Sequence, residues 1–444
     1  MEAESALIAM SESDHLNAST RCQLARFCLQ IEKPHLARGI LEKALAAAPR
    51  SEEVHFLTGL AEKELGYAHE SLAHFSQAGP ESNPDAAYYL SIVHQELGSL
   101  ESACEAIQWA LSVSAEDADY LNQQACVLGQ MGEHEAALEA SEAALTIEPQ
   151  SAGFAVNHAQ NLLAAGRFAE AWPLYEARLA FLPEQVFPRN GAKPWEGESL
   201  DGKSLLVWHE QGLGDTIHFS RFLPRLPGLA KSVVFRAQAA LCGLMSSALP
   251  GITVVSADAP VPATDFHVPL LSLPGRLGFP TSGLLLPLWP AIPQVSPPPG
   301  SRRKIGFVCR GNPNHPDDTQ RSVPADVFCH LFDLPHAWVC LQKQLNGRNG
   351  WPVGVENPAS GFRNFADTAG AIAGLDLVIS VDTAVAHLAA SLGVATWILL
   401  PHTPDWRWGL SGPSTPWYPA ARLFRQPVPG DWISVVQSIE NELS

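Results

Sequence analysis

Two patterns of apolar and polar positions follow one another along the chain. Up to about residue 185 the sequence consists of helical segments rich in Ala, Leu and Glu, separated by regularly spaced glycines. Beyond residue 203 it consists of short apolar, β-branched runs that alternate with helical stretches. Such alternation is typical of a doubly wound parallel sheet. The pattern therefore predicts an α region followed by an α/β region.

The first region has an internal repeat. Its turn glycines recur at intervals of 32, 34 and 34 residues, and Pro149 and Pro183, which end the second helix of their units, are also 34 residues apart. We expect about five helix–turn–helix units, the first of which has Lys33-Pro34 where the turn glycine would be. The turn glycines are Gly66, Gly98, Gly132 and Gly166, and the units are expected near 18–50, 51–83, 84–117, 118–151 and 152–185.

This periodicity resembles the tetratricopeptide repeat, in which small residues let two helices approach closely and a proline stops the second helix. We therefore assign residues 1–185 to a tetratricopeptide α-solenoid. The concave face of such an array usually binds a peptide or protein segment. Residues 1–190 carry 27 acidic and 10 basic side chains, so this face is expected to favour basic or hydroxyl-rich partners. Packing on the rest of the chain and oligomerisation are the alternatives.

Charge and cysteine content exclude several functions. Of the net charge of −18, −17 lies within residues 1–190, and Lys63 is the only Lys or Arg between Arg50 and Arg167, so the repeats are not expected to bind nucleic acid. The eight cysteines are scattered without metal-ligand spacing, which predicts free thiols in the cytoplasm and no zinc site. Neither a signal peptide nor a membrane span is expected.

The second region is expected to form two Rossmann-like halves. A Gly- and Pro-rich linker at 186–203 leads to one half at 204–290 and another at 291–444, with a proline-rich connection at Leu284–Pro299. Two such halves place a cleft between the carboxyl ends of their strands. The expected strands are Ser204–Glu210, Ser232–Arg236, Ile252–Ser256, Phe266–Leu271, Lys304–Cys309, Ala337–Leu341, Leu377–Val381 and Thr396–Leu400.

Two strand-to-helix turns are candidate binding sites. Asp382-Thr383 ends an apolar strand and begins a helix, so its backbone N–H groups suit a phosphate or diphosphate, although Asp and Thr are also ordinary helix caps. Gln211, Gly212 and Gly214 form a tight turn before Asp215, which is either a general base or a helix cap. The turn lacks the third glycine of a dinucleotide-binding loop, which argues against NAD.

The ordered motifs His209–Pro224, Gly311–His315 with Arg321-Ser322, Val381–Ala390 and Pro404–Trp408 resemble the heptosyltransferase-like (family 9) glycosyltransferases. The whole chain is similar to bacterial proteins that fuse tetratricopeptide repeats to that module. The resemblance covers residues 203–444. It implies a GT-B fold of two Rossmann-like domains, with a nucleotide-diphosphate sugar as co-substrate, no other cofactor and no metal in the chemistry.

The resemblance also implies roles for single residues. Asp215 matches the catalytic aspartate, and Asp382, Thr383 and His387 match the donor motif, in which Ala384 stands where the family usually has glycine. No lysine of this chain clearly matches the family's phosphate-binding lysine, and Arg321 is the nearest cation in the corresponding loop. Asn312 and Gln342 are further donor-side candidates. Asn312 is also an ordinary turn residue, and a solvated Lys343 explains the Gln342-Lys343 pair equally well. The Asp405–Trp408 segment is either part of the cleft wall or a loop anchor.

The expected function is the transfer of a sugar to an acceptor hydroxyl. Asp215 would accept the proton of that hydroxyl, and the repeats would bind a polypeptide or glycan acceptor or a partner protein. The alternative is a non-catalytic repeat scaffold whose α/β module only binds a ligand or partner.

Overall fold

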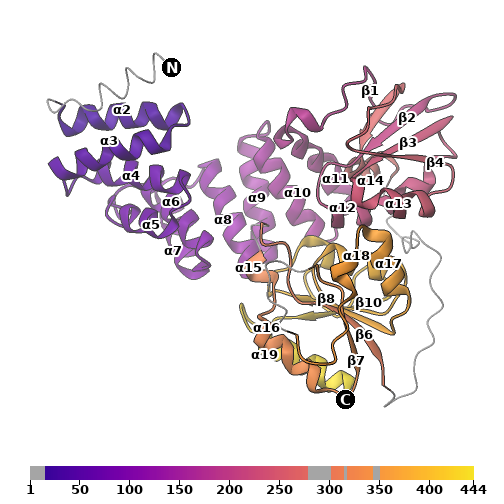
Figure 1. Cartoon of the computed structure of the whole chain (residues 1–444). Helices are drawn as coiled ribbons and strands as arrows, with labels where there is room; N and C mark the ends of the chain where they lie inside the picture. Colours follow the sequence, from indigo (N-terminus) through magenta and orange to yellow (C-terminus); the bar gives the residue numbers. More distant parts are fainter. Residues whose placement is uncertain (1–15, 279–301, 315–317, 344–350) are drawn as a thin grey trace. The chain divides into compact units, whose positions relative to one another are not determined.

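The computed structural model describes residues 16–278, 302–314, 318–343 and 351–444 (Figure 1). The chain divides into two compact units, Met1–Asn161 and Leu162–Ser444. This division falls inside the last expected repeat, whereas the sequence places a domain boundary after residue 185. Where the independently folding domains begin and end stays a prediction, and the 290/291 boundary and the Leu284–Pro299 connection lie outside the described residues.

Five pairs of successive helices occupy the positions of the five expected repeats. The turn between the two helices of each later pair contains a glycine with a positive φ, as at Gly132 (φ 84°). The helices are α2 (Ala18–Gln30), α3 (Pro34–Ala47), α4 (Glu52–Glu64), α5 (Ala68–Phe75), α6 (Pro84–Glu96), α7 (Leu100–Val113), α8 (Ala118–Met131), α9 (His134–Ile147), α10 (Ala152–Ala164) and α11 (Phe168–Tyr175).

The first repeat makes its turn without glycine. Glu32 has a φ of 58° and is the only non-glycine residue with a positive φ among those described. It precedes Gly66 by 34 residues, so it takes the left-handed position that glycine fills in the later repeats. Lys33-Pro34, which was expected at that place, instead begins α3, with Pro34 in its first turn.

The segment after α11 is held to the first α/β half by a buried ion pair. Arg178, in the 3₁₀ helix η1 (Glu176–Phe181), donates to both carboxylate oxygens of Glu210 at 2.9 and 2.8 Å. It also donates to the hydroxyl of Ser272 at 3.0 Å, and the side chain of Glu210 is fully buried. The residues that follow the repeats are therefore part of the α/β unit.

The first half contains a parallel sheet of five strands in the order β1-β5-β2-β3-β4. Strand β1 lies within the expected linker, so part of that linker joins the sheet edge. The strands are β1 (Lys193–Pro194), β2 (Ser204–Trp208), β3 (Ser232–Ala237), β4 (Ile252–Ser256) and β5 (Phe266–Pro269), and the helices are α12 (Leu213–Phe219), α13 (Ala239–Ala248) and α14 (Leu273–Arg276), with the 3₁₀ helices η2 (Glu184–Val186), η3 (Ser220–Arg225) and η4 (Leu270–Ser272).

The second half contains another parallel sheet of five strands, in the order β10-β9-β8-β6-β7. One of these, β10, was not expected from the sequence. The strands are β6 (Lys304–Val308), β7 (Ala337–Cys340), β8 (Leu377–Val381), β9 (Thr396–Leu400) and β10 (Ala421–Arg425). The helices are α15 (Asp318–Arg321), α16 (Ala325–Phe328), α17 (Phe365–Ala373), α18 (Ala384–Ser391) and α19 (Trp432–Leu443), with the 3₁₀ helices η5 (Cys329–Asp333), η6 (Pro358–Gly361) and η7 (Trp406–Trp408).

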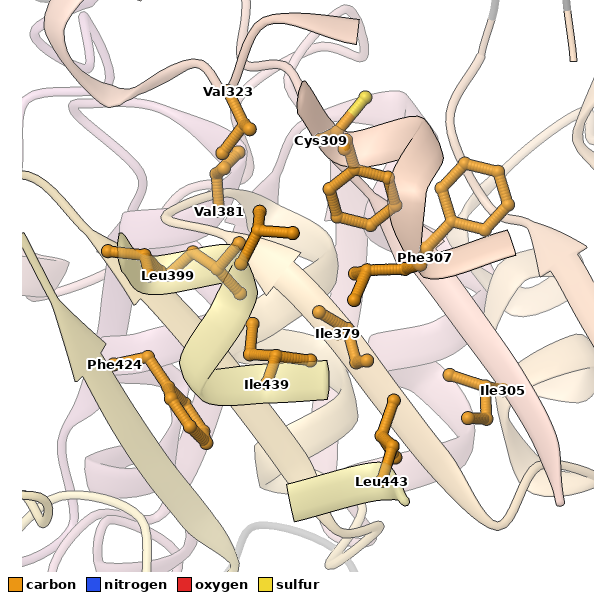
Figure 2. Close-up of a cluster of buried hydrophobic side chains, with 14 of the residues drawn as sticks. Ile305, Phe307, Cys309, Val323, Ile379, Val381, Leu399, Phe424, Ile439 and Leu443 are labelled. Carbon is orange, nitrogen blue, oxygen red and sulfur yellow. The ribbon is translucent and has the colours of Figure 1, made fainter. Parts of the chain in front are cut away.

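Helix α19 covers one face of this second sheet. Figure 2 shows Ile439 and Leu443 of this helix beside the strand residues Ile305, Ile379 and Leu399. All five residues of β8 are buried, which explains why this strand is a continuous apolar run in the sequence. The core thereby fixes the carboxyl end of β8, where the candidate site begins.

The helical segment after β2 differs from its prediction. The sequence predicts a helix over Thr216–Leu226, whereas α12 begins at Leu213 and changes to a 3₁₀ helix at Ser220. Pro224 lies within that 3₁₀ segment and cannot donate a backbone hydrogen bond. The earlier start places Asp215 inside the first turn of α12.

Candidate functional site

Both sheets have a topological switch point, where consecutive connections leave a strand in opposite directions. In the first sheet it lies between β2 and β5, and in the second between β6 and β8. Ligands of open parallel sheets bind at the carboxyl ends of such strands. Asp215 follows β2, Gly311 follows β6 and Asp382 follows β8. The structure thus places these predicted residues at switch points.

The turn after β2 is closed by Asp215. Its Oδ2 accepts a hydrogen bond from the backbone N–H of Gly212 at 3.1 Å, and Gly212 is the N-cap residue of α12. The backbone carbonyl of Gln211 accepts from the side chain of Gln238 at 2.9 Å. The capping role is therefore observed, and the catalytic role of Asp215 stays a prediction.

The other oxygen of Asp215 is paired with Arg407. Arg407 Nη2 donates to Asp215 Oδ1 at 2.6 Å, and its Nη1 donates to the two oxygens of Asp405 at 2.9 and 3.0 Å. The guanidinium is buried and lies 4.4 Å from the ring centroid of Trp406. Burial by itself would lower the pKa of Arg407, but the charges of the two carboxylates outweigh it and raise that pKa. The Asp405–Trp408 segment stands out in the sequence for its aromatic residues, and the pairing of Arg407 with Asp215 was not predicted.

The turn after β8 is a capped helix start. Thr383 is the N-cap of α18, and its hydroxyl accepts from the backbone N–H of Ala386 at 3.4 Å. Burial favours a raised pKa for Asp382, but a hydrogen bond from His387 and the nearby charges more than offset it and lower that pKa. Asp382 therefore stays ionised beside the N-terminus of α18.

His387 belongs to a chain of side chains that joins the two halves. Its Nε2 lies 3.5 Å from Asp382 Oδ1, and its Nδ1 lies 2.7 Å from the hydroxyl of Tyr418. The same hydroxyl lies 2.9 Å from Nδ1 of His218 in α12. Tyr418 has one hydroxyl proton, so it donates to one histidine and accepts from the other. Neither His218 nor Tyr418 was predicted as a site residue: His218 lies within the His209–Pro224 motif without an assigned role, and Tyr418 lies outside every motif.

This arrangement explains the protonation of His218. If His387 keeps its Nε2 proton beside Asp382, Tyr418 donates to His387 and accepts from His218 Nδ1. His218 Nε2 is then unprotonated, in agreement with its burial without a hydrogen-bond partner among the described residues. Burial, followed by the charge of Arg221, lowers the pKa of His218 far below its ordinary range.

The N-termini of α12 and α18 approach closely. A Cβ atom added to Gly214 would lie 3.1 Å from His387 Cδ2 and 3.7 Å from the backbone nitrogen of Ala384. His387 is stacked on Trp408 with 5.1 Å between ring centroids, so it has little freedom to move aside. Gly214 is thus required by helix packing, and it lies over the helix start that the sequence predicts as an anion site.

The turn after β6 contains the remaining donor candidates. Gln342 Oε1 accepts from the backbone N–H of Arg310 at 3.2 Å, so it braces this turn from the end of β7. Asn312 accepts from the backbone N–H of Asn314 at 3.1 Å, which is the turn-forming alternative considered for it. A Cβ added to Gly311 would lie 2.6 Å from Arg321 Nε, which places Arg321 directly against this turn. Arg321 itself pairs with Asp318 at 3.3 Å.

His209 lies in the turn after β2, and its burial leads us to expect that the stability of the α/β unit decreases at acidic pH. Burial and then the charge of Arg236 lower its pKa to about 4. Below about pH 6.5 the unfolded chain binds a proton that the folded chain does not. The free energy of unfolding therefore decreases as the pH is lowered from about 6.5 to about 4. The decrease is at most about 3 kcal/mol, and it is smaller because the ring is partly exposed. Urea unfolding followed by tryptophan fluorescence at several pH values measures this, since eleven of the twelve tryptophans lie beyond residue 161.

The variant His209→Gln supplies the control for this prediction. It removes the titrating ring, so its stability should change less between about pH 7 and pH 5 than that of the wild type. An equal loss of stability in both proteins would contradict the assignment to His209.

The described residues contain no group of three or more His, Cys, Asp or Glu side chains that could hold a metal ion. No helix among them is long and apolar enough to cross a membrane. All eight cysteines are free thiols.

Comparison with known proteins supports the assignment of tetratricopeptide repeats to the first region. Residues 118–151, which contain α8 and α9, match the tetratricopeptide repeat family. Protein FlbA of Caulobacter vibrioides (strain ATCC 19089 / CIP 103742 / CB 15) is 26% identical over 318 residues, which cover 61% of this chain and 51% of FlbA. The chain therefore spans about half the length of this curated relative. The tetratricopeptide prediction is confirmed, and the transferase resemblance stays a prediction.

Several solved structures are similar to part of this chain, one of them a tetratricopeptide-repeat protein. MamA is 20% identical, with 35% of this chain and 92% of MamA covered and a TM-score of 0.31. The tetratricopeptide protein TTC0263 of Thermus thermophilus is 20% identical, with 38% and 92% covered and a TM-score of 0.33. PilF of Pseudomonas aeruginosa is 18% identical, with 38% and 77% covered and a TM-score of 0.34.

Proposed function

We propose that the chain is a glycosyltransferase that moves a sugar from a nucleotide-diphosphate sugar to an acceptor hydroxyl. The observation that carries this proposal is the meeting of α12 and α18, the helices that follow the switch-point strands of two separate parallel sheets. This contact places the first turn of α12, which contains Asp215, beside the start of α18, where Thr383 and His387 lie. The ordered motifs that resemble family 9 glycosyltransferases, and the GT-B arrangement that they imply, support the same proposal.

In this proposal the second half binds the donor. The diphosphate lies at the start of α18, where backbone N–H groups and the helix dipole favour negative charge, with Arg321 as the neutralising cation. Stabilising the departing diphosphate in this way requires no metal. Because Gly214 lies over Ala384, α12 and α18 must separate when the donor enters.

The first half supplies the base, and the repeats supply the interaction surface. Asp215 accepts the proton of the acceptor hydroxyl once opening has freed it from Arg407. Tetratricopeptide repeats indicate a protein-interaction role, so we assign acceptor or partner binding to them. The free thiols agree with a cytoplasmic location, which belongs to this proposal.

A panel of nucleotide-diphosphate sugars tests the proposal. Incubation of the full chain with each donor is expected to release the nucleotide diphosphate from at least one of them, and nucleotide diphosphates are expected to raise its melting temperature. The proposal would be refuted if a panel that covers uridine, guanosine, cytidine, thymidine and adenosine donors gave no nucleotide release and no rise in melting temperature.

Replacing Arg321 with Ala is expected to weaken nucleotide-diphosphate binding by about 1.5–3 kcal/mol, because a charge-assisted contact is lost. Isothermal titration calorimetry measures this. The control is Arg363→Ala, which removes the same charge from an exposed arginine of the same half that also pairs with an aspartate, Asp367, and should leave the affinity unchanged. Equal affinities for wild type and Arg321→Ala would remove Arg321 from the donor site.

One observation favours the alternative of a non-catalytic scaffold. Both oxygens of Asp215 accept hydrogen bonds, one from Arg407 and one from Gly212, which is the arrangement of a structural anchor. In that alternative the α/β module holds its two halves together through this pair and only binds a ligand or partner. Nucleotide binding without turnover is the outcome that would support it.

A further inference from the structure

The first helices of successive repeats share a row of aromatic rings. Phe56 of α4 lies 5.7 Å from Tyr89 of α6, and Tyr88 of α6 lies 5.3 Å from Tyr120 of α8, measured between ring centroids. The rings of Tyr88 and Tyr89 are 5.0 Å apart, so the row is continuous over three repeats. Phe56, Tyr88 and Tyr89 are only partly buried, and neither tyrosine hydroxyl makes a hydrogen bond among the described residues. These three rings are therefore accessible to a ligand, whereas the ring of Tyr120, which is 4% exposed, is buried.

Unpaired carboxylates lie beside this row. Residues 64–166 contain fifteen Asp and Glu and no Lys or Arg, and none of these carboxylates forms an ion pair with a Lys or Arg among the described residues. Asp119 and Glu64 are exposed. Burial, and then the charges of Asp85, Asp119 and Glu64, raise the pKa of Tyr89, so these carboxylates are close enough to act on its ring.

We propose that this surface, which we call the aromatic–acidic face and define by Phe56, Glu64, Tyr88, Tyr89 and Asp119, binds an extended peptide segment that bears Lys or Arg side chains. Cationic side chains lie favourably over tyrosine and phenylalanine rings and pair with carboxylates. The accessible rings lie on α4 and α6 and Asp119 lies on α8, so the face spans three repeats and suits several cations spaced along one peptide. The proposal deepens the protein-binding role of the repeats and is independent of sugar transfer.

Polar side chains extend the face towards the next repeat. Asn157 of α10 donates to Asn122 of α8 at 2.9 Å, and Gln123 donates to Gln95 at 2.8 Å. Asn122 keeps its own amide donor, and Asn157 keeps its carbonyl acceptor, for a main chain that runs along the helices. Nucleic acid does not fit this surface, since its phosphates would meet the carboxylates.

Fluorescence anisotropy with the full chain tests the proposal. The probe is a labelled peptide of about twelve residues in which Arg and Ser alternate, and its counterpart has Glu in place of Arg. At low salt we expect saturable binding of the Arg peptide, no binding of the Glu peptide, and weaker binding as added salt screens the charges. The absence of saturable binding of the Arg peptide would overturn the proposal.

A matched pair of double variants separates the face from general attraction. Glu64→Gln with Asp119→Asn removes two charges from the face and should weaken binding about tenfold, at roughly 0.7 kcal/mol for each charge. Glu105→Gln with Glu139→Gln removes the same charge from exposed positions on the second helices α7 and α9, and should change binding less than about twofold. Equal weakening by both double variants would overturn the proposal, because binding would then follow net charge alone.

Discussion

Replacing Asp215 with Asn is expected to lower the rate of sugar transfer by on the order of 10²–10⁴-fold, the usual contribution of a general base. Asn keeps the shape of the side chain and much of its ability to cap α12, but it cannot accept the acceptor's proton. The same change removes one carboxylate from the buried Arg407, so a loss of about 1–3 kcal/mol of stability should accompany it. Transfer rate and urea unfolding therefore have to be measured on the same protein.

Asp405→Asn is the matched control for this experiment. It removes the other carboxylate that binds Arg407, and the same charge, from a residue that is not proposed to touch the acceptor. We expect a loss of stability at least as large as that of Asp215→Asn, because Asp405 accepts two hydrogen bonds from Arg407, with transfer largely retained. If both variants lose stability alike and Asp215→Asn still transfers sugar, Asp215 is a structural anchor and the scaffold alternative is favoured.

Replacing Glu210 with Gln is expected to destabilise the α/β unit by about 3–5 kcal/mol, because it leaves the guanidinium of Arg178 buried without a counter-charge. The backbone N–H of Leu271 donates to the same carboxylate at 3.0 Å, so a second buried group is weakened with it. Urea unfolding monitored by tryptophan fluorescence measures this loss.

Glu442→Gln is the control for that change. It makes the same substitution in an exposed ion pair: Glu442 pairs with Arg422, and the two side chains are 43% and 44% exposed, respectively. Exposed pairs contribute little, so the loss should stay below about 1 kcal/mol. A similar small loss for Glu210→Gln would show that the Arg178–Glu210 pair does not anchor the segment after the repeats.

The repeats were predictable because their information is local. A turn glycine between two helices recurs at intervals of 32–34 residues, and a proline ends the units at Pro149 and Pro183, so each unit can be recognised from its own residues. The exception is Glu32, whose left-handed φ is imposed by the position of its helices and not by its own preference. The buried strands were also predictable from local sequence, and the bounds predicted for Leu377–Val381 and Thr396–Leu400 are those observed. Strand β10 (Ala-Arg-Leu-Phe-Arg) was missed because its arginines interrupt the apolar run.

The candidate site divides in the same way. Local sequence patterns show which turns follow the buried strands, and so place Asp215, Asp382 and Thr383 at the carboxyl edges of the sheets. The contacts of these residues became visible with the folded chain: Arg407 pairs with Asp215 across 192 residues, and Tyr418 contacts His218 across 200. Capping is fixed within one helical turn, whereas ion pairs between distant segments depend on how the sheets and helices pack, which no local pattern records.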